Sequence, residues 1–253
     1  MLRRALAQVE DFSQPILPGK GGSDYERYLR TDELLALQKT PEEQAHRDEL
    51  LFQTTHQSSE LWLKFACQEV ETAAQLVREG DIGGALRLLR RSTLAIQFIT
   101  ANLDMLEHMS PWEYTKEIRP VLGHGSGFDS PGFRDVRRVT PALGAAFEEA
   151  LAATGLDAVQ LYVRAREHEQ LYQLAEALVE WDERITNWRI RHYKVVARII
   201  GDQVVGTQGT PVEVLGKMIH HNFFPALWRA RNQLTALAKD EEGSESDTPG
   251  HGR

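Results

Sequence analysis

Apolar residues recur every three or four positions along most of this chain, which is the pattern of amphipathic helices. A stretch between Pro41 and Gly80 contains no further proline or glycine. Thr40 is a suitable N-cap, so we predict one long helix that begins at Pro41. His56 lies within it on the same face as Phe52, and that face is largely apolar. The ordinary interpretation is a core histidine that hydrogen-bonds a neighbouring helix.

The same period predicts the other elements. Further helices are expected over residues 25–38 and 85–108, a short one from Pro111, then 131–139, 141–151, within 156–200, and from Pro211 onward. As a single helix, residues 156–200 would be about 68 Å long, so we expect a bend or loop inside them. His192, in the last part of that stretch, again lies on an apolar face, and a structural role is its default interpretation.

These elements predict an all-α protein, a bundle of long antiparallel helices. No segment alternates apolar and polar residues over more than a few positions, as strands do. We expect a flexible N-terminal arm over residues 1–22 and a single helical domain over residues 23–239. Residues 240–253 are acidic and then rich in glycine, serine and proline, so we expect a disordered tail.

Composition narrows the function classes. The net charge of -8 argues against nucleic acid as a partner, because phosphate binding needs a basic surface. The chain has no apolar run of membrane-spanning length and no signal peptide at its start. Cys67 is the single cysteine, which excludes an internal disulfide and a zinc site built from several cysteines. A cytoplasmic protein fits this cysteine usage.

Inward-facing histidines on long helices are a common way to hold a metal or a haem. His56 and His192 are therefore candidate ligands, although neither belongs to the Glu-x-x-His motif of di-iron bundles. Three glycines surround Ser126, a pattern that lets backbone approach a ligand and that a plain turn explains equally well. Arg119, taken alone, is most simply a surface arginine. The residues by themselves leave both a ligand pocket and a purely structural bundle open.

Several motifs, in order along residues 24–232, resemble those of the tryptophan 2,3-dioxygenase family. They are Tyr25-Glu-Arg-Tyr28-Leu29, Asp48-Glu-Leu-Leu-Phe52, His56-Gln-Ser-Ser-Glu-Leu-Trp62-Leu-Lys64, Met109-Ser-Pro-Trp-Glu-Tyr114, Arg119 to Gly123, Gly125-Ser126-Gly127-Phe128-Asp-Ser130, Trp188-Arg-Ile-Arg-His192, Arg198-Ile-Ile-Gly201 with Gly206-Thr207, and Phe223-Phe224-Pro225-Ala-Leu-Trp228. So many ordered matches identify the chain as similar to that family over most of its length.

The resemblance implies an all-helical homotetramer with one b-type haem per subunit, ferrous iron, and dioxygen as co-substrate. His192 matches the proximal iron ligand, and His56 matches the catalytic histidine that hydrogen-bonds the indole N–H. Arg119 matches the arginine that binds the substrate carboxylate, and Thr207 the threonine that contacts the ammonium or carboxylate group. The remaining matches concern the pocket wall. Phe52, Tyr114 and Ser126 match pocket-lining positions, and Tyr25 and Tyr28 match tyrosines of the N-terminal helix that reach a neighbouring subunit's pocket.

Three departures from the family pattern bear on the site. Tyr114 and Arg119 are five residues apart where the family has four, which on an α-helix rotates one by about 100° relative to the other. The family loop resembles Gly-Thr-Gly-Gly-Ser-x-Gly, whereas residues 206–212 read Gly-Thr-Gln-Gly-Thr-Pro-Val, and one extra residue precedes Gly206. A helical insertion expected between Phe147 and Leu161 is missing or nearly so.

The resemblance implies insertion of dioxygen into the indole ring of L-tryptophan or a close analogue, giving an N-formylkynurenine-type product. The departures favour a specialised member, so the alternative is a monooxygenase of a substituted tryptophan in natural-product biosynthesis, for example one that converts β-methyltryptophan to an oxindole-type product. A haem-binding or small-molecule sensor without turnover and a helical interaction protein without cofactor are the alternatives from other classes.

Overall fold

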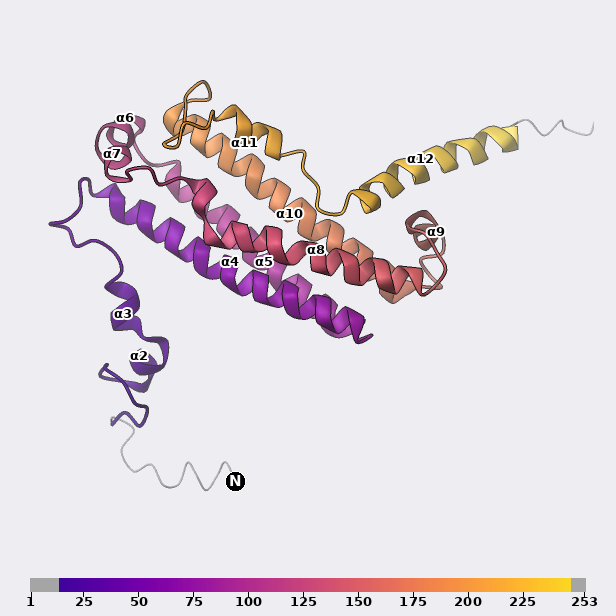
Figure 1. Cartoon of the computed structure of the whole chain (residues 1–253), viewed down its shortest axis with the longest axis horizontal. Helices are drawn as coiled ribbons and strands as arrows, with labels where there is room; N and C mark the ends of the chain where they lie inside the picture. Colours follow the sequence, from indigo (N-terminus) through magenta and orange to yellow (C-terminus); the bar gives the residue numbers. More distant parts are fainter. Residues whose placement is uncertain (1–13, 247–253) are drawn as a thin grey trace, which may run out of the picture. The chain divides into compact units, whose positions relative to one another are not determined.

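The computed structural model describes residues 14–246, and side chains as far as residue 240 (Figure 1). It divides into two compact units, residues up to 54 and residues from 55 onward, and each is described by itself. Within the described residues the regular elements are helices, and the one β-bridge is an isolated pair, Val205 with Pro211. The all-α prediction is confirmed.

The first unit contains two short helices, α2 (Asp24–Leu29) and α3 (Thr31–Leu35), where one helix over residues 25–38 was expected. Arg30 separates them because its backbone is left-handed, with φ of 54°. The Ser23 hydroxyl caps α2 by accepting a hydrogen bond from the Glu26 N–H. The Asp24 carboxylate accepts hydrogen bonds from two backbone N–H groups of the expected flexible arm, which fixes that part of it against α2. Residues 1–13 of the arm lie outside the described residues.

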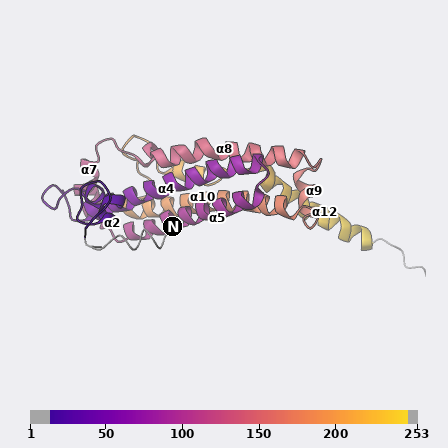
Figure 2. The ribbon, with the colours of Figure 1, turned by 90° about the horizontal axis from the view of Figure 1, so that it is seen from below.

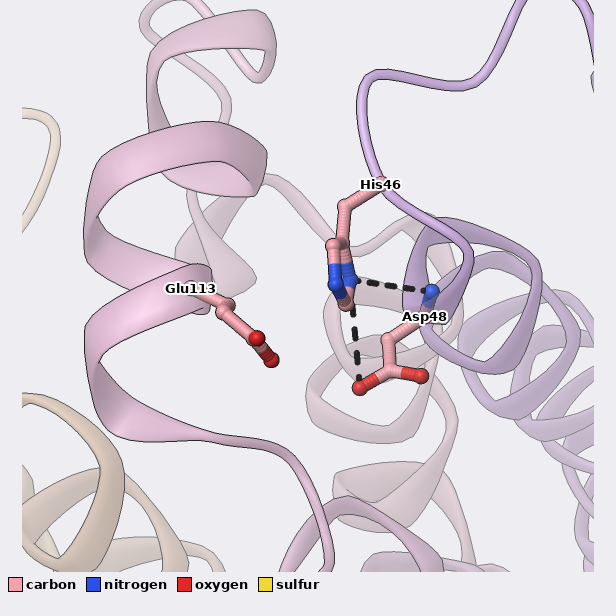
Figure 3. Close-up of side chains that lie close together, drawn as sticks. All are labelled: His46, Asp48 and Glu113. Carbon is pink, nitrogen blue, oxygen red and sulfur yellow. Dashed lines mark hydrogen bonds and ion pairs between the residues drawn. The ribbon is translucent and has the colours of Figure 1, made fainter.

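Helix α4 (Asp48–Arg78) begins seven residues later than predicted. The expected start at position 41 is wrong because residues 40–43 form a turn, in which the Glu43 carboxylate accepts a hydrogen bond from the Thr40 N–H. The true start is set by His46, whose Nδ1 accepts a hydrogen bond of 3.2 Å from the Asp48 N–H (Figure 3). The same imidazole nitrogen lies 3.9 Å from the Asp48 carboxylate.

The second unit is a bundle of long helices. Beside the part of α4 from residue 55 onward lie α5 (Ile82–Leu106), α8 (Pro131–Ala152) and α10 (Glu169–Ile200), as Figures 1 and 2 both show. The three residues between α4 and α5 reverse the chain, so these helices are antiparallel. None of the described helices is long and apolar enough to cross a membrane.

Shorter elements complete this unit: α9 (Ala158–Val163), α11 (Glu213–Met218) and α12 (Pro225–Ser246). The expected interruption within residues 156–200 is the loop between α9 and α10. Pro141 does not begin a helix as predicted but lies inside α8. Helix α12 continues to residue 246, so the first part of the expected disordered tail is helical.

Two buried polar side chains in the middle of α10, Trp181 and Asp182, hold it to its neighbours. Trp181 is fully buried, and its Nε1 donates to the Thr140 hydroxyl of α8 at 3.1 Å. Asp182, also fully buried, accepts hydrogen bonds from the Phe223 N–H and from Trp228 Nε1, both at 2.9 Å. Because a buried carboxylate is stable only when its oxygens are satisfied, these bonds fix the chain before α12 against α10.

The start of α8 lies very close to α4, and Gly132 makes this possible. The Glu60 carboxylate accepts hydrogen bonds from the Gly132 N–H at 2.9 Å and from the Ser130 hydroxyl. A Cβ on Gly132 would lie 2.6 Å from the Leu63 Cβ, well inside van der Waals contact. The glycine is therefore required by the approach of the two helices, not by its backbone angles.

Replacing Gly132 with alanine is expected to lower the free energy of unfolding by about 1–3 kcal/mol, because the added methyl group overpacks a filled contact. Urea unfolding followed by circular dichroism measures this. Gly83→Ala is the matched control, since the nearest atom to its added Cβ is 3.9 Å away. A Gly132→Ala protein as stable as the control would show that α8 and α4 are farther apart than described.

Candidate active site

The segment that carries Tyr114 and Arg119 is a π-helix, residues Tyr114–Ile118, followed by α7 (Arg119–Val121). The Arg119 backbone N–H donates to the Tyr114 carbonyl, five residues earlier. In a π-helix a hydrogen bond to the carbonyl five residues earlier closes one turn, whereas in an α-helix the carbonyl is four residues earlier. The five-residue spacing therefore still places the two residues one turn apart, and the expected rotation of Tyr114 away from Arg119 is wrong.

A physical reason for the wide turn is Pro120. Inside an α-helix a proline ring collides with the carbonyl four residues earlier, here that of Lys116. A π-turn moves that carbonyl away, so the extra residue and the proline are compatible with each other. Burial raises the pKa of the Tyr114 phenol, and the nearby Arg119 charge lowers it in part. Tyr114 and Arg119 thus act in one local environment.

Arg119 is half-buried and reaches a loop 86 residues later in the chain, where its guanidinium donates to the Val205 carbonyl at 2.6 Å. In the same loop the Thr207 hydroxyl donates to the Gly125 carbonyl at 2.5 Å. The loop that carries Thr207 is therefore bonded both to Arg119 and to Gly125, the neighbour of the predicted pocket residue Ser126. The interpretation of Arg119 as a plain surface arginine is wrong.

The glycine-rich loop is ordered by a capping box. Ser126 accepts a hydrogen bond from the Phe128 N–H, and the Asp129 carboxylate accepts one from the Ser126 N–H at 3.1 Å. The Gln208 side-chain amide donates to the same Asp129 oxygen at 2.6 Å.

Neither Asp129 nor Gln208 was predicted from the sequence as a site residue. The capping-box spacing was a signal for Asp129, but nothing local identifies Gln208, whose partner is 79 residues away.

His192 lies at this end of the bundle in aromatic surroundings. Its ring stacks on Trp188 with centroids 4.7 Å apart and planes 9° from parallel, and Trp188 contacts Phe133 at 3.9 Å. A Cβ on Gly127 would lie 4.0 Å from His192 Nε2, so the glycine-rich loop faces this nitrogen. Burial, and secondly the charge of His56, lower the pKa of His192 to about 4. The imidazole is therefore neutral at pH 7.

The bonding of His192 does not suit a purely structural histidine. His192 is half-buried, and within the described part of the chain neither of its ring nitrogens takes part in a hydrogen bond. A neutral imidazole with an uncommitted nitrogen is the form that binds iron or another transition metal. Its aromatic neighbours are Trp188, on the same helix, and Phe133, which packs against Trp188. The residues at this position fit a haem ligand.

His56 differs from the core histidine that its apolar neighbours suggested. Its side chain is exposed, whereas Thr55 beside it is buried. It lies near enough to His192 for its charge to lower the pKa of that residue. An exposed histidine that faces a second histidine from another long helix is better placed to meet a ligand than to support the core.

The remaining predicted residues belong to the first unit. Tyr25 and Tyr28, on α2, are 69% and 78% exposed. Phe52 is half-buried in the first turns of α4. Nothing in this unit's own packing requires the two tyrosines, which leaves them accessible to another molecule.

Comparison with known proteins decides the family. The model of the family described as tryptophan 2,3-dioxygenase matches residues 12–145, more than half of the chain. A tryptophan 2,3-dioxygenase of Bradyrhizobium sp. (strain BTAi1 / ATCC BAA-1182) is 32% identical, with 85% of this chain and 94% of the relative covered. The chain belongs to the tryptophan 2,3-dioxygenase family.

Other relatives agree with this membership. A tryptophan 2,3-dioxygenase of Bacillus thuringiensis (strain Al Hakam) is 30% identical over the same shares of both chains. One of Pseudomonas fluorescens is 31% identical, with 83% of this chain and 90% of the relative covered. The protein is thus a member of an enzyme family, and the family supports tryptophan dioxygenation as its chemistry. The match to the family model ends at residue 145, before His192 and Thr207.

Proposed function

We propose that this chain is a haem-dependent oxygenase that inserts dioxygen across the carbon 2–carbon 3 bond of the indole ring of L-tryptophan or a close analogue, giving an N-formylkynurenine-type product. The observation that carries the proposal is the convergence of Arg119, Thr207 and the glycine-rich loop, together with the uncommitted imidazole of His192 facing that same loop. On this proposal the amino-acid end of the substrate and the haem ligand lie on either side of the glycine-rich loop.

His192 would hold the haem iron through a ring nitrogen, and haem, when bound, supplies the iron chemistry that activates dioxygen. The chain's own residues bind and orient the substrate. The Arg119 guanidinium pairs with the substrate carboxylate, a fork geometry that fixes direction as well as position. The Thr207 hydroxyl contacts the ammonium or carboxylate group beside it.

His56 would accept the indole N–H at a ring nitrogen and so fix the other end of the substrate. With both ends held, the reacting carbons are presented in one orientation, which is the protein's main contribution to such a reaction. Phe52, Tyr114 and Ser126 are proposed to line the pocket and exclude water. We further propose a cytoplasmic homotetramer in which Tyr25 and Tyr28, exposed on α2, contact a neighbouring subunit.

Turnover of L-tryptophan under isotopically labelled dioxygen is expected to give a product that contains two heavy oxygen atoms, because both atoms enter the indole ring. Mass spectrometry of the product measures this directly, with unlabelled dioxygen as the control. A panel of substituted tryptophans, including β-methyltryptophan, is run in parallel. One heavy atom in the product of a substituted tryptophan, with L-tryptophan unchanged, would replace the proposal with a monooxygenase.

A further inference from the structure

Three side-chain hydrogen bonds join the loop of residues 202–211 to the segment of residues 119–129. They are Arg119 to the Val205 carbonyl, Thr207 to the Gly125 carbonyl, and Gln208 to the Asp129 carboxylate. Two of the three donors are the residues that the proposed function assigns to the amino-acid end of the substrate. Both would exchange a loop carbonyl for a substrate group when the substrate binds.

The third bond is of another kind. Gln208 donates to a carboxylate oxygen, a charge-assisted bond that is stronger than one to a neutral carbonyl. That oxygen also accepts the Ser126 N–H, so the bond ends on the capping box that orders the glycine-rich loop. Neither Gln208 nor Asp129 is needed by the substrate, so this bond persists when the other two are exchanged.

Within the loop, the backbone already holds a defined shape. The Gly206 N–H donates to the Thr210 carbonyl at 2.8 Å, and the Val212 N–H to the Val204 carbonyl at 3.1 Å. Gly209 has φ of 76°, which a glycine adopts without strain. The loop is therefore a small rigid unit, and one external anchor is enough to set the position of Thr207 at its tip.

We propose that Gln208 is a positioning residue, which holds the Thr207 loop against the capping box through Asp129 while Arg119 and Thr207 turn to the substrate. The inference rests on the proposed function for its effect on substrate. It assigns a role to a residue that stands where the family pattern has a glycine. The anchor holds the Thr207 loop in place before substrate arrives.

The test measures the affinity of the haem-loaded protein for L-tryptophan by calorimetry. Gln208→Ala is expected to raise the Kd about two- to fivefold, because a solvent-exposed hydrogen bond contributes at the low end of the usual range. In turnover, kcat should change less than KM. Gln208→Glu places two carboxylates together and weakens binding further. The double variant Gln208→Glu with Asp129→Asn restores binding, because the asparagine oxygen still accepts the Ser126 N–H while its amide donates to the new carboxylate. Gln203→Ala is the control, an exposed glutamine of the same loop region.

Amide hydrogen exchange at Gly206 and Val212 tests the anchor without any substrate. Exchange should become several-fold faster in Gln208→Ala and return to the wild-type rate in the double variant. If the variants change the exchange rates in this way but the wild-type protein binds no L-tryptophan, the anchor is supported and the proposed substrate is overturned. Unchanged exchange and an unchanged Kd in Gln208→Ala, or a double variant no better than Gln208→Glu, would overturn the positioning role.

Discussion

Replacing His192 with alanine is expected to abolish haem binding while leaving the helical fold intact. The imidazole is neutral at pH 7 and lies beside the glycine-rich loop. Losing even a residue that only supports a metal ligand reduces affinity about 10- to 100-fold, and loss of the ligand itself should cost more. The Soret absorbance of protein purified after haem supplementation measures the result, and far-ultraviolet circular dichroism reports the fold.

The matched control is His220→Ala, which removes an exposed histidine after the end of α11. It should retain a wild-type Soret band. His192→Gly supplemented with imidazole separates loss of the ligand from loss of packing, since the added imidazole can fill the space left by the side chain. A His192→Ala protein that keeps haem with an unchanged spectrum would contradict the assignment of the ligand.

Much of the bundle followed from hydrophobic periodicity, because long helices repeat the signal over many turns. Helix α5 and the broken stretch that became α9 and α10 are examples. The start of α4 did not follow. Thr40 and Pro41 are a common N-terminal sequence of a helix, but this helix begins at Asp48. There His46 accepts a hydrogen bond from the Asp48 N–H, and Glu49 accepts one from the Ala45 N–H. The free energies of the cap at Thr40 and the cap at His46 differ by too little for a sequence pattern to predict which one forms.

The site shows a second kind of limit. Family resemblance located Tyr114 and Arg119, but their spacing predicted that they would face apart. The π-helix reverses that conclusion. Pro120 is plain in the sequence, but its link to a π-helix became clear only from the hydrogen bond between the Arg119 N–H and the Tyr114 carbonyl. Gln208 was missed for a related reason, since its bond to Asp129 joins two loops. Contacts between distant loops leave no periodic trace in a sequence.

On the proposed function, Arg119 has one partner without substrate and another with it. Without substrate its guanidinium holds the Val205 carbonyl and so helps to close the loop that carries Thr207. With substrate, on the proposed function, the same group pairs with a carboxylate. Because the guanidinium would give up the Val205 carbonyl when it binds the substrate, the measured loss in binding is the difference between these two interactions, and a charged pair is the stronger of the two.

Replacing Arg119 with alanine is accordingly expected to weaken L-tryptophan binding by about 2–5 kcal/mol, because a substrate carboxylate is then left without its charged partner. Calorimetry of the haem-loaded protein measures the Kd, and tryptamine, which lacks the carboxylate, provides the internal comparison. Wild type should prefer L-tryptophan over tryptamine strongly, and Arg119→Ala should lose most of that preference. Arg119→Lys keeps the charge but not the fork and should lie between the two. Arg87→Ala, which removes an exposed arginine of α5, serves as the surface control. An Arg119→Ala protein that still discriminates the two ligands as wild type does would place the carboxylate site elsewhere, despite the one-turn alignment with Tyr114.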